Sequence, residues 1–481
     1  MLNKILKEFF GEILSDIPDI KFKELHTNSK LVKELDAFIA INGLTVDGHQ
    51  FIPCAVEKGA KLLFVSKKDV PLYAGVGCIY IENLDAVAGK VAKMFYNYPE
   101  KSLKFIGITG TNGKTTTSFM IEQMMQCPVV KIGTVEYKVG DVCFEAPNTT
   151  PEPVQLTRLF NLAVQKGIEW VVMEVTSHAL ELKRVEDIEF NVAIFTNLTQ
   201  DHLDFHLTME NYFEAKAKLF SMLKNPKNAV INIDDAWGAK LYERYPQAST
   251  FSLAKKATIQ GQILAESLEG MRAELKVEDK TYRVDIPYLG EYNLQNVIST
   301  LISVSMTGLS LEELIEKSPK LKQVPGRFEL IKNEKNKIVV VDFAHTSDAL
   351  ENILSTMKRL AKGKIITVFG AGGDRDKTKR PLMAKVAAKY SDFVVVTSDN
   401  PRNEEPNKIL LDVVEGLHEV KYPKGCYKII ESREEAISFA IAHAQVSDAV
   451  LIAGKGHEQY QIIGREKHFF SDQKVARKYL K

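Results

Sequence analysis

The sequence predicts an α/β protein with three domains, built around a parallel sheet that carries a phosphate-binding loop. Short apolar runs alternate with longer helical patterns along most of the chain, as they do in parallel sheets whose strands are joined by helices. A Gly-rich segment, GITGTNGKTTT (107–117), stands between one such run and a helical pattern. The length of 481 residues also exceeds what a single hydrophobic core usually holds.

Changes of pattern along the chain place the domains at residues 1–98, 99–323 and 324–481. The first contains the β-like runs KLLFV and GCIYIE and ends at NYPEKS, which is typical of a linker. The second starts with the continuous apolar strand KFIGITG. After QVPGRFE the strand pattern restarts, and each new strand ends in Gly, His or charge. We therefore predict a small N-terminal α/β domain, a central P-loop sheet with flanking helices, and a C-terminal Rossmann-like α/β domain.

The composition indicates a reduced, water-soluble environment and no nucleic-acid partner. Lys+Arg 63 and Asp+Glu 62 leave a net charge of +1, so no overall field favours nucleic acid. No apolar run reaches the roughly 18 residues of a membrane span. The N-terminal segment MLNKILKEFFGEIL predicts an amphipathic helix rather than a signal peptide. The five cysteines have neither the spacing of disulfide pairs nor that of metal ligands: Cys54, Cys78, Cys127, Cys143 and Cys426. We expect a cytoplasmic monomer without a membrane partner.

The Gly-rich segment predicts an ATP site. Gly110 and Gly113 let the backbone turn its N–H groups toward phosphate oxygens, and the helix that follows adds partial positive charge. Lys114 can reach the β- and γ-phosphates, and the Thr115 hydroxyl is placed for Mg²⁺. Ile108 occupies a position that is glycine in the strict pattern, so this is a variant loop.

Two later segments, MEVTSHAL (173–180) and TNLTQDHLDFH (196–206), bring polar residues to the ends of neighbouring strands. Taken singly, Asp201 fits a turn or helix cap, and His202 fits a capping or core histidine. Placed together beside a phosphate loop, they favour a magnesium site, because Mg²⁺ prefers carboxylate, hydroxyl and water ligands. The residues alone do not choose between Lys216 and Lys218 of the next helix.

The loop TGTNGKTTT resembles that of the Mur ligases, ATP-dependent enzymes that add amino acids to the peptidoglycan precursor. Folylpolyglutamate synthetases share the same central domain, so the loop alone does not separate the two. The resemblance implies that His202 and Glu174 bind magnesium with Thr115, and that the lysine of YFEAK, Lys216, carries a carbamate formed with carbon dioxide. Lys114, Lys216 and His202 are then the catalytic residues. The implied ATP contacts in the loop are Gly110, Thr111, Asn112, Gly113, Lys114, Thr115 and Thr116.

Further motifs resemble the set that closes over ATP in this family. Asn293 and Asn296 of GEYNLQN lie three residues apart, on one face of an expected helix. Helix capping explains these asparagines equally well, and Arg327 of PGRFE could be a solvated charge. The resemblance implies that the asparagines lie by the adenine, and that Arg327 and Asp342 reach ATP from the C-terminal domain. The chain reads FAHTS where the family usually reads YAHTP, which leaves Asp342 and His345 unchanged.

Three strands of the C-terminal domain end in clusters that suit a zwitterion. The clusters are GAGGDRDKTKRP, VVVTSDNPRNEEP (394–406) and AGKGHE. Arginines can hold a carboxylate with paired hydrogen bonds, and acids can accept from an ammonium group. A network of salt bridges between loops, without a ligand, is the alternative. The candidate amino-acid-binding residues are Arg375, Asp399, Asn400, Pro401, Arg402, Gly454 and Glu458.

The sequence DNPR matches the branch of the family that adds diaminopimelate, in which this arginine binds the far carboxylate of the amino acid. The resemblance covers essentially the whole chain. It implies the ATP-driven addition of meso-diaminopimelate, or of a two-headed analogue such as lanthionine, to UDP-N-acetylmuramoyl-L-alanyl-D-glutamate through an acyl phosphate. A lysine-adding relative, a folylpolyglutamate-synthetase-like ligase and a non-catalytic nucleotide switch are the alternatives. His202, His206 and His345 are candidate bases for the amine, and Arg402 is expected to set the choice of amino acid.

The N-terminal segment TNSKLVKELDAFIAINGLTVDGHQFI resembles the uridine-binding segment of the family. The chain has Asn28-Ser29-Lys30 where the family commonly has Asp-Ser-Arg, and lysine keeps the charge but lacks the planar fork. The contacts implied for the UDP-linked precursor are Ser29, Lys30, His49, Asn148, Thr149, Thr150, Ser177 and Arg184.

Overall fold

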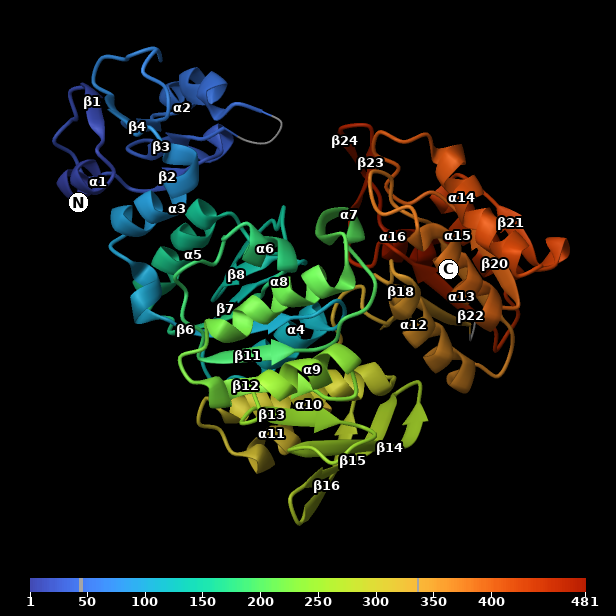
Figure 1. The fold of residues 1–481 in the computed structure, drawn as a ribbon. Coiled ribbons are helices and arrows are strands. Elements are labelled where there is room, and N and C mark those ends of the chain that lie inside the picture. The colour runs from blue at the N-terminus through green and yellow to red at the C-terminus, as the bar shows by residue number, and fades with distance from the viewer. Residues whose placement is uncertain (43–45, 335–336) are drawn as a thin grey trace. The chain divides into compact units, whose positions relative to one another are not determined.

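The computed structural model confirms the predicted α/β class, with several sheets flanked by helices (Figure 1). The structure describes residues 1–42, 46–334 and 337–481. Two compact units are formed by Met1–Ile106 with Gln126–Asn191, and by Gly107–Met125 with Val192–Lys481. Among the described residues, no helix has the length and apolar character that a membrane crossing requires. The division at residues 98 and 323 stays a prediction.

The N-terminal part of the first unit is a five-stranded sheet in the order β1-β5-β4-β3-β2, in which only β1 is antiparallel. The helix predicted over the first residues is shorter than expected. It ends at Glu8, because Phe10 adopts a left-handed φ of 50°, and Ile13 then lies in a strand. The elements are α1 (Leu2–Glu8), β1 (Glu12–Ser15), β2 (Leu25–His26), η1 (Ser29–Leu31), β3 (Ala37–Ala40), η2 (Gly48–Phe51), α2 (Ile52–Glu57), β4 (Leu62–Val65), β5 (Gly77–Tyr80) and α3 (Leu84–Phe95).

The rest of the first unit has strands in the order β10-β7-β8-β9, with β10 parallel to β7. Strand β6 (Lys104–Thr109) belongs to both units, since the division falls after Ile106. Ser177 begins α6, where the Thr176 hydroxyl caps the helix by accepting from the Ala179 N–H at 3.2 Å. The elements are η3 (Pro99–Ser102), β7 (Val129–Ile132), β8 (Tyr137–Val139), β9 (Val142–Phe144), α5 (Pro153–Gln165), β10 (Trp170–Glu174) and α6 (Ser177–Glu181).

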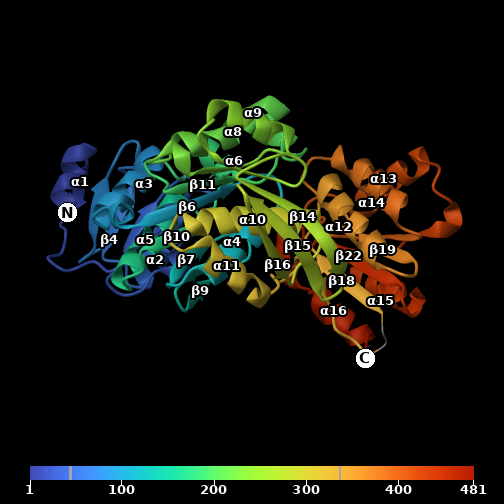
Figure 2. The same ribbon diagram turned by 90° about the horizontal axis from the view of Figure 1, so that it is seen from below.

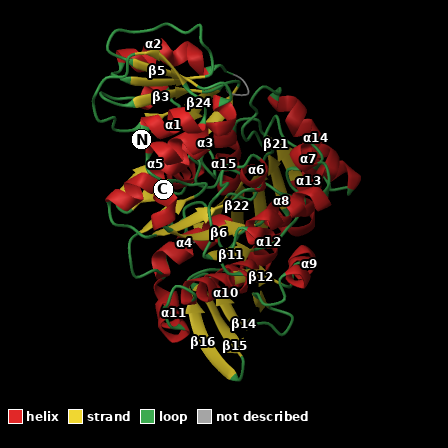
Figure 3. Ribbon diagram, turned by 60° about the vertical axis from the view of Figure 1, so that its left-hand side comes forward, coloured by secondary structure: helices red, strands yellow, loops and turns green. Residues whose placement is uncertain are grey.

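In the second unit, β11 to β14 are parallel, and β15 and β16 continue the sheet as antiparallel strands (Figure 3). The antiparallel extension was not anticipated from the sequence. The elements of this part are α4 (Lys114–Met124), β11 (Val192–Phe195), α7 (Leu203–His206), α8 (Met209–Ser221), η4 (Pro226–Asn228), β12 (Ala229–Asn232), α9 (Ala236–Arg244), β13 (Ser249–Ser252), β14 (Ile259–Ser267), β15 (Gly270–Val277), β16 (Lys280–Ile286), α10 (Glu291–Ser305), α11 (Leu311–Lys317) and η5 (Ser318–Lys320).

The C-terminal sheet of the second unit has the order β17-β18-β22-β19-β20-β21, and all its strands except β17 are parallel. Helices α12, α13 and α14 cover one face, and α15 and α16 cover the other (Figure 2). The elements are β17 (Glu329–Leu330), β18 (Ile338–Asp342), α12 (Ser347–Leu360), β19 (Ile365–Phe369), α13 (Lys379–Tyr390), β20 (Phe393–Val396), α14 (Pro406–Glu419), η6 (Lys424–Cys426), β21 (Tyr427–Ile429), α15 (Arg433–His443), β22 (Ala449–Ala453) and α16 (Asp472–Tyr479).

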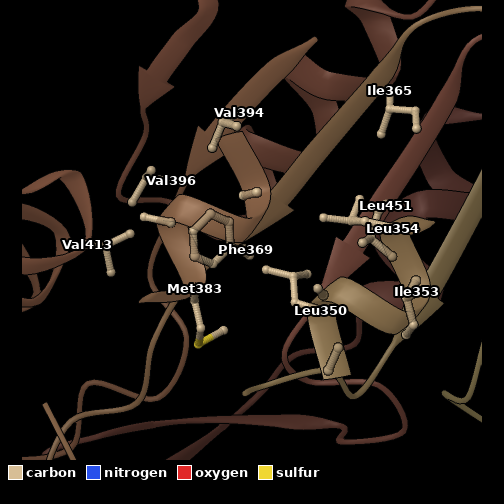
Figure 4. Close-up of a cluster of buried hydrophobic side chains, with 14 of the residues drawn as sticks. Leu350, Ile353, Leu354, Ile365, Phe369, Met383, Val394, Val396, Val413 and Leu451 are labelled. Atoms are coloured by element: carbon tan, nitrogen blue, oxygen red, sulfur yellow. The ribbon is translucent and has the colours of Figure 1, made fainter. Parts of the chain in front are cut away.

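The core of this sheet explains why its strand ends are well positioned. Leu354 of α12, Met383 of α13 and Val413 of α14 share one buried cluster with Phe369 of β19 (Figure 4). The central strands β19 and β22 are fully buried, and β18 and β20 are buried except for their first residue, as parallel sheets covered on both faces require. Ligands bind at the carboxyl ends of the strands in open α/β sheets. In this sheet those ends are therefore held in place by a well-packed core. A hairpin of β23 (Tyr460–Ile463) and β24 (Glu466–Phe469) follows β22.

Candidate functional site

The phosphate loop lies between β6 and α4, as the sequence predicted. Gly110 has a φ of 146° and Gly113 a φ of 90°. A side chain at Gly110 would overlap the Thr196 hydroxyl, and a Cβ at Gly113 would lie 2.5 Å from Asn296 Oδ1. Both positions therefore need glycine for the backbone conformation and for close packing.

The end of β11 fixes the shape of this loop. The Thr111 N–H donates to the Asn197 carbonyl at 2.9 Å, and the Asn112 N–H donates to Asn197 Oδ1 at 2.9 Å. The Thr196 hydroxyl donates to the Asn112 carbonyl at 2.6 Å. Thr196 and Asn197 thus hold the loop in a defined conformation, which was not assigned to them from the sequence.

Two lysines converge on the same loop carbonyl. Lys114 Nζ donates to the carbonyls of Gly110, at 2.9 Å, and Thr111, at 2.8 Å. Lys216 Nζ, whose side chain is 2% exposed, donates to the Gly110 carbonyl at 2.8 Å. Burial, and secondly the charge of Lys114, lower the pKa of Lys216 well below its ordinary value. Lys218 is exposed, so the structure separates two lysines that local reasoning left equivalent.

The two asparagines of α10 lie beside the phosphate-loop helix. Thr117 of α4 donates through its hydroxyl to Asn296 Oδ1 at 3.3 Å. Asn296 Nδ2 donates in turn to Asn293 Oδ1 at 3.2 Å, and Asn293 Nδ2 donates to the Leu289 carbonyl at 2.8 Å. Both side chains are buried, so neither asparagine is a solvent-facing helix cap.

Arg327 reaches the phosphate-loop helix from the C-terminal part of the same unit, and Asp342 accepts from the backbone of the residue that follows Arg327. Arg327 Nη2 donates to Thr115 Oγ1 at 3.0 Å. The Asp342 carboxylate accepts from the backbone N–H groups of Phe328 and Ala344, both at 2.6 Å. Burial raises the pKa of Asp342 to about 6. Because Arg327 is half-buried and hydrogen-bonded to Thr115, the alternative of a solvated surface charge is wrong.

Asp201 lies among three basic side chains of the second unit. Its carboxylate lies 3.5 Å from His202 Nε2, 3.9 Å from His345 Nε2 and 3.7 Å from Lys379 Nζ. Burial opposes ionisation of Asp201, but the neighbouring charges of His202, Lys379 and His345 hold its pKa below the usual range. Burial lowers the pKa of His345 to about 4. The third histidine, His206, is buried and stacks on a tyrosine ring.

The residues expected at magnesium are divided between the two units. Thr115, His202 and Lys216 belong to the second unit, and Glu174 belongs to the first. Glu174 ends β10, and its carboxylate accepts from the Thr134 N–H and hydroxyl, each at 3.0 Å. Across residues 1–42, 46–334 and 337–481, no three His, Cys, Asp or Glu side chains cluster as metal ligands would.

Several residues expected at the precursor form one cluster in the first unit. Thr150 donates through its hydroxyl to the Glu174 carbonyl at 2.8 Å, and Arg184 Nη1 donates to the Thr150 carbonyl at 3.0 Å. The Thr149 hydroxyl lies 3.1 Å from the Thr134 hydroxyl. Asn148 accepts through its carbonyl from a tyrosine hydroxyl. Ser177, at the start of α6 and three residues after Glu174, is also buried.

The expected uridine residues lie at the carboxyl ends of the N-terminal strands. The Asn28 side chain caps η1 by accepting a hydrogen bond from the Lys30 N–H at 3.0 Å. In this turn Ser29 is buried and Lys30 is exposed to solvent. His49 Nδ1 lies 2.7 Å from Asp47 Oδ1, and its Nε2 accepts from the Ser66 N–H at 3.1 Å. Gly43, Leu44 and Thr45, also in the expected uridine segment, lie outside the described residues.

The candidate amino-acid residues gather at the ends of β19, β20 and β22, as predicted. Arg402 has a φ of 52° and donates from Nη1 to the Gly373 carbonyl at 2.7 Å. Burial, and secondly the nearby charge of Arg375, lower the pKa of Arg402. Both arginines flank Gly372, where an added Cβ would lie 2.9 Å from Arg402 Nη1 and 3.8 Å from Arg375 Cγ. Such a pair is typical of a site for a carboxylate.

A buried lysine that sequence reasoning missed lies under this site. Lys455, which is 0% exposed, donates to Asn400 Oδ1 at 2.9 Å and to Glu458 Oε2 at 3.0 Å. Asn400 Nδ2 also donates to Glu458 Oε2, at 3.0 Å. At Gly454, a Cβ would lie 2.5 Å from Asp399 Oδ2, so glycine there leaves room for the acid. The signal for Lys455 was its place inside AGKGHE.

An ion pair that was also not predicted from the sequence, Arg380 with Glu404, joins two of the strand-end loops. Arg380, fully buried, donates to both oxygens of Glu404, at 3.1 and 2.8 Å, and to Asp412 at 2.7 Å. Glu404 also accepts from the Asp374 N–H at 2.6 Å. Hydrogen bonding to Arg380 lowers the pKa of Glu404 to about 2. This pair links the loop of Arg375 to the loop of Arg402.

Together these features define an α/β enzyme that has a phosphate loop and a cluster of charged side chains at the strand ends of one unit. Three family models match the chain. They are the Mur ligase family, catalytic domain, at residues 21–96, the Mur ligase middle domain at 108–304, and the Mur ligase, glutamate ligase domain, at 326–456. The chain belongs to the Mur ligase family and is an ATP-dependent ligase.

Curated relatives match along the whole chain. The UDP-N-acetylmuramoyl-L-alanyl-D-glutamate–2,6-diaminopimelate ligase of Fusobacterium nucleatum is 43% identical, covering 97% of this chain and 96% of that protein. The protein of the same name from Clostridium tetani is 39% identical, covering 100% and 99%. A solved structure of a ligase of this name is 33% identical, with a TM-score of 0.60 over 97% of this chain and 96% of that one.

More distant structures share the fold. MurF ligase from Thermotoga maritima, solved in complex with ADP, is 20% identical, with a TM-score of 0.70 over 96% of this chain and 98% of that one. Folylpolyglutamate synthase from Mycobacterium tuberculosis is 18% identical, with a TM-score of 0.61, and it covers 77% of this chain. At these identities the likeness shows the fold alone.

Proposed function

We propose that the protein adds 2,6-diaminopimelate to UDP-N-acetylmuramoyl-L-alanyl-D-glutamate, with conversion of ATP to ADP and phosphate, in peptidoglycan synthesis. The observation that carries the proposal is the arginine pair, Arg375 and Arg402, beside the acids Asp399 and Glu458. The names of the relatives that match the whole chain support the same substrates. Cell-wall growth, cell shape and division would then depend on this reaction.

The charges of the pocket favour an amino acid with two carboxylates. Diaminopimelate carries a carboxylate and an ammonium group at each end, whereas lysine lacks the second carboxylate. Arg402 and Arg375 would bind that carboxylate, while Asp399 and Glu458 would accept from the ammonium beside it. Lysine would leave the partly buried Arg402 without an anion, which is costly for a charge that is partly removed from water. Lanthionine, with the same two ends, would satisfy the same contacts.

We further propose that the phosphate loop, Asn293, Asn296, Arg327 and Asp342 bind ATP. Magnesium, when bound, would neutralise charge on the phosphates, and Thr115, Glu174, His202 and a carbamate on Lys216 are the residues that would hold it. The buried setting of Lys216 fits this modification, because a lowered pKa keeps the amine neutral, and the neutral amine is the form that reacts with carbon dioxide.

The proposed reaction has two steps. Lys114 and the loop orient the γ-phosphate for attack by the terminal carboxylate of the precursor, which gives an acyl phosphate and ADP. The neutral amine of the diamino acid then attacks the acyl carbon, phosphate leaves, and the amide forms with loss of a proton. The precursor would contact Ser29, Lys30, His49, Asn148, Thr149, Thr150, Ser177 and Arg184.

The domains would divide this work in chain order. Residues 1–98 would bind the uridine end of the precursor, 99–323 would bind ATP, and 324–481 would bind the amino acid. The balanced charge of the chain gives no reason for a nucleic-acid partner. We propose a cytoplasmic monomer, because the small-molecule substrates named above require no partner subunit.

Phosphate release by the purified protein tests this proposal. With ATP, Mg²⁺ and the UDP-linked dipeptide, we expect stimulation by meso-diaminopimelate or lanthionine but not by lysine. Stimulation by lysine alone would make the protein a lysine-adding ligase. Failure to bind the UDP-linked precursor would favour a folylpolyglutamate-synthetase-like ligase. Slow hydrolysis of ATP that no substrate accelerates would indicate a nucleotide switch.

A further inference from the structure

We propose that the hairpin of β23 and β24 is a positioning element for Arg402, and that Gln461 is the side chain through which it acts. This inference rests on the proposed function, in which Arg402 binds the second carboxylate of the diamino acid. It adds a residue that determines specificity and that lies outside the charged clusters.

The hairpin is bonded to the segment that carries the pocket. The Arg402 N–H donates to the Ile462 carbonyl at 3.1 Å, and the Gly464 N–H donates to the Arg402 carbonyl at 2.8 Å. These two bonds form a parallel bridge between Arg402 and Ile463. The segment around Arg402 thus has the hairpin as a neighbouring strand, and both backbone groups of Arg402 are used in the pairing.

Two bonds that involve side chains complete the attachment. Gln461 Nε2 donates to the Asp399 carbonyl at 2.7 Å. The Ile462 N–H donates to Asn400 Oδ1 at 3.0 Å. Asn400 Oδ1 is the same atom that accepts from Lys455, so the hairpin also joins the buried polar network under Glu458. Asp399, Asn400 and Arg402 are all bonded to this one element.

Arg402 needs such support because its conformation is unfavourable. A φ of 52° is uncommon for a residue with a side chain and persists only where the surroundings impose it. Its side chain also shares the neighbourhood of Gly372 with Arg375, whose like charge repels it. If the backbone of Arg402 relaxed to an extended conformation, its guanidinium would leave the Gly373 carbonyl and with it the carboxylate site.

Apart from these bonds, the hairpin contacts two lysines of neighbouring segments, with Lys455 Nζ 5.8 Å from the centre of the Tyr460 ring and Lys474 Nζ 4.6 Å from that of Phe469. In the parts of the chain that the structure describes, β23 and β24 pair as strands only with each other. All residues of β24 are exposed, with Phe469 at 67%. A two-stranded hairpin alone is marginally stable in water. Pairing with the segment Asp399–Arg402 therefore has two effects. It stabilises the hairpin, and it fixes the backbone of Arg402.

The test is Gln461→Leu, which removes the donor and keeps the size, measured by phosphate release with the full-length protein. We expect KM for diaminopimelate to rise about five- to tenfold, the effect of one lost hydrogen bond. KM for ATP and for the UDP-linked dipeptide should stay within about twofold. The matched control is Gln459→Leu, the same change at an exposed side chain two residues earlier, which should resemble the wild type.

A double-mutant cycle separates positioning from general damage. If Gln461 acts through Arg402, Gln461→Leu should change KM for diaminopimelate far less in an Arg402→Lys background. An unchanged KM for diaminopimelate in Gln461→Leu would overturn the inference, and so would an equal rise in all three KM values. Absence of diaminopimelate-dependent phosphate release in the wild type would overturn the proposed function instead.

Discussion

Replacing Lys216 by methionine is expected to lower turnover by about a thousandfold or more, the scale seen when a group that stabilises transition-state charge is removed. Lys216 is buried against the phosphate loop, and its amine is proposed to become an oxygen ligand after reaction with carbon dioxide. Methionine has similar length, and Lys114 still donates to the Gly110 carbonyl, so the melting temperature should fall only slightly. Steady-state phosphate release and thermal unfolding measure the two effects.

Lys218→Met is the matched control, since Lys218 lies on the same helix and is exposed. It should retain near wild-type turnover. Depleting carbon dioxide should slow the wild type, and bicarbonate should restore it. Turnover of Lys216→Met within about tenfold of the wild type would show that no essential group is formed there, and an equal loss in Lys218→Met would contradict the assignment.

Lys114→Met should lower kcat/KM for ATP by about a thousandfold, because the lysine is proposed to hold the β- and γ-phosphates during transfer. In this structure its ammonium is bound by two loop carbonyls, which places it directly over the loop. Binding of the UDP-linked dipeptide should be unchanged, as measured by calorimetry. Lys104→Met, at the opposite end of β6, serves as the control.

A different pattern would contradict this role. If Lys114→Met and Lys104→Met lowered kcat/KM for ATP equally, the loss would reflect the fold rather than phosphate contact. If Lys114→Met weakened binding of the UDP-linked dipeptide and left ATP use intact, Lys114 would belong to the precursor site.

The parts of the fold that local sequence determines were predicted well. The strand before the phosphate loop and the helix after it are recognisable because glycine, apolar runs and helical spacing act over a few residues. The four main strands of the C-terminal sheet were found for the same reason. The N-terminal helix was predicted too long, since the amphipathic pattern continues past Phe10 while the backbone turns there.

The rest depended on contacts between distant segments. The sequence could not separate Lys216 from Lys218, because burial against Gly110 is set by the packing of α8. Lys455 was missed because its partners Asn400 and Glu458 meet only in the folded sheet. The hairpin that supports Arg402 was missed likewise, because each of its strands has only four residues and little apolar burial.

The most direct test of the central claim is the mass of the product formed in competition. The protein is incubated with ATP, Mg²⁺ and UDP-N-acetylmuramoyl-L-alanyl-D-glutamate, with equal concentrations of meso-diaminopimelate and lysine. We predict that the UDP-linked product gains the mass of diaminopimelate less water, in step with ADP. A product that gains only lysine, or ADP formed without any amide product, would contradict the proposed function.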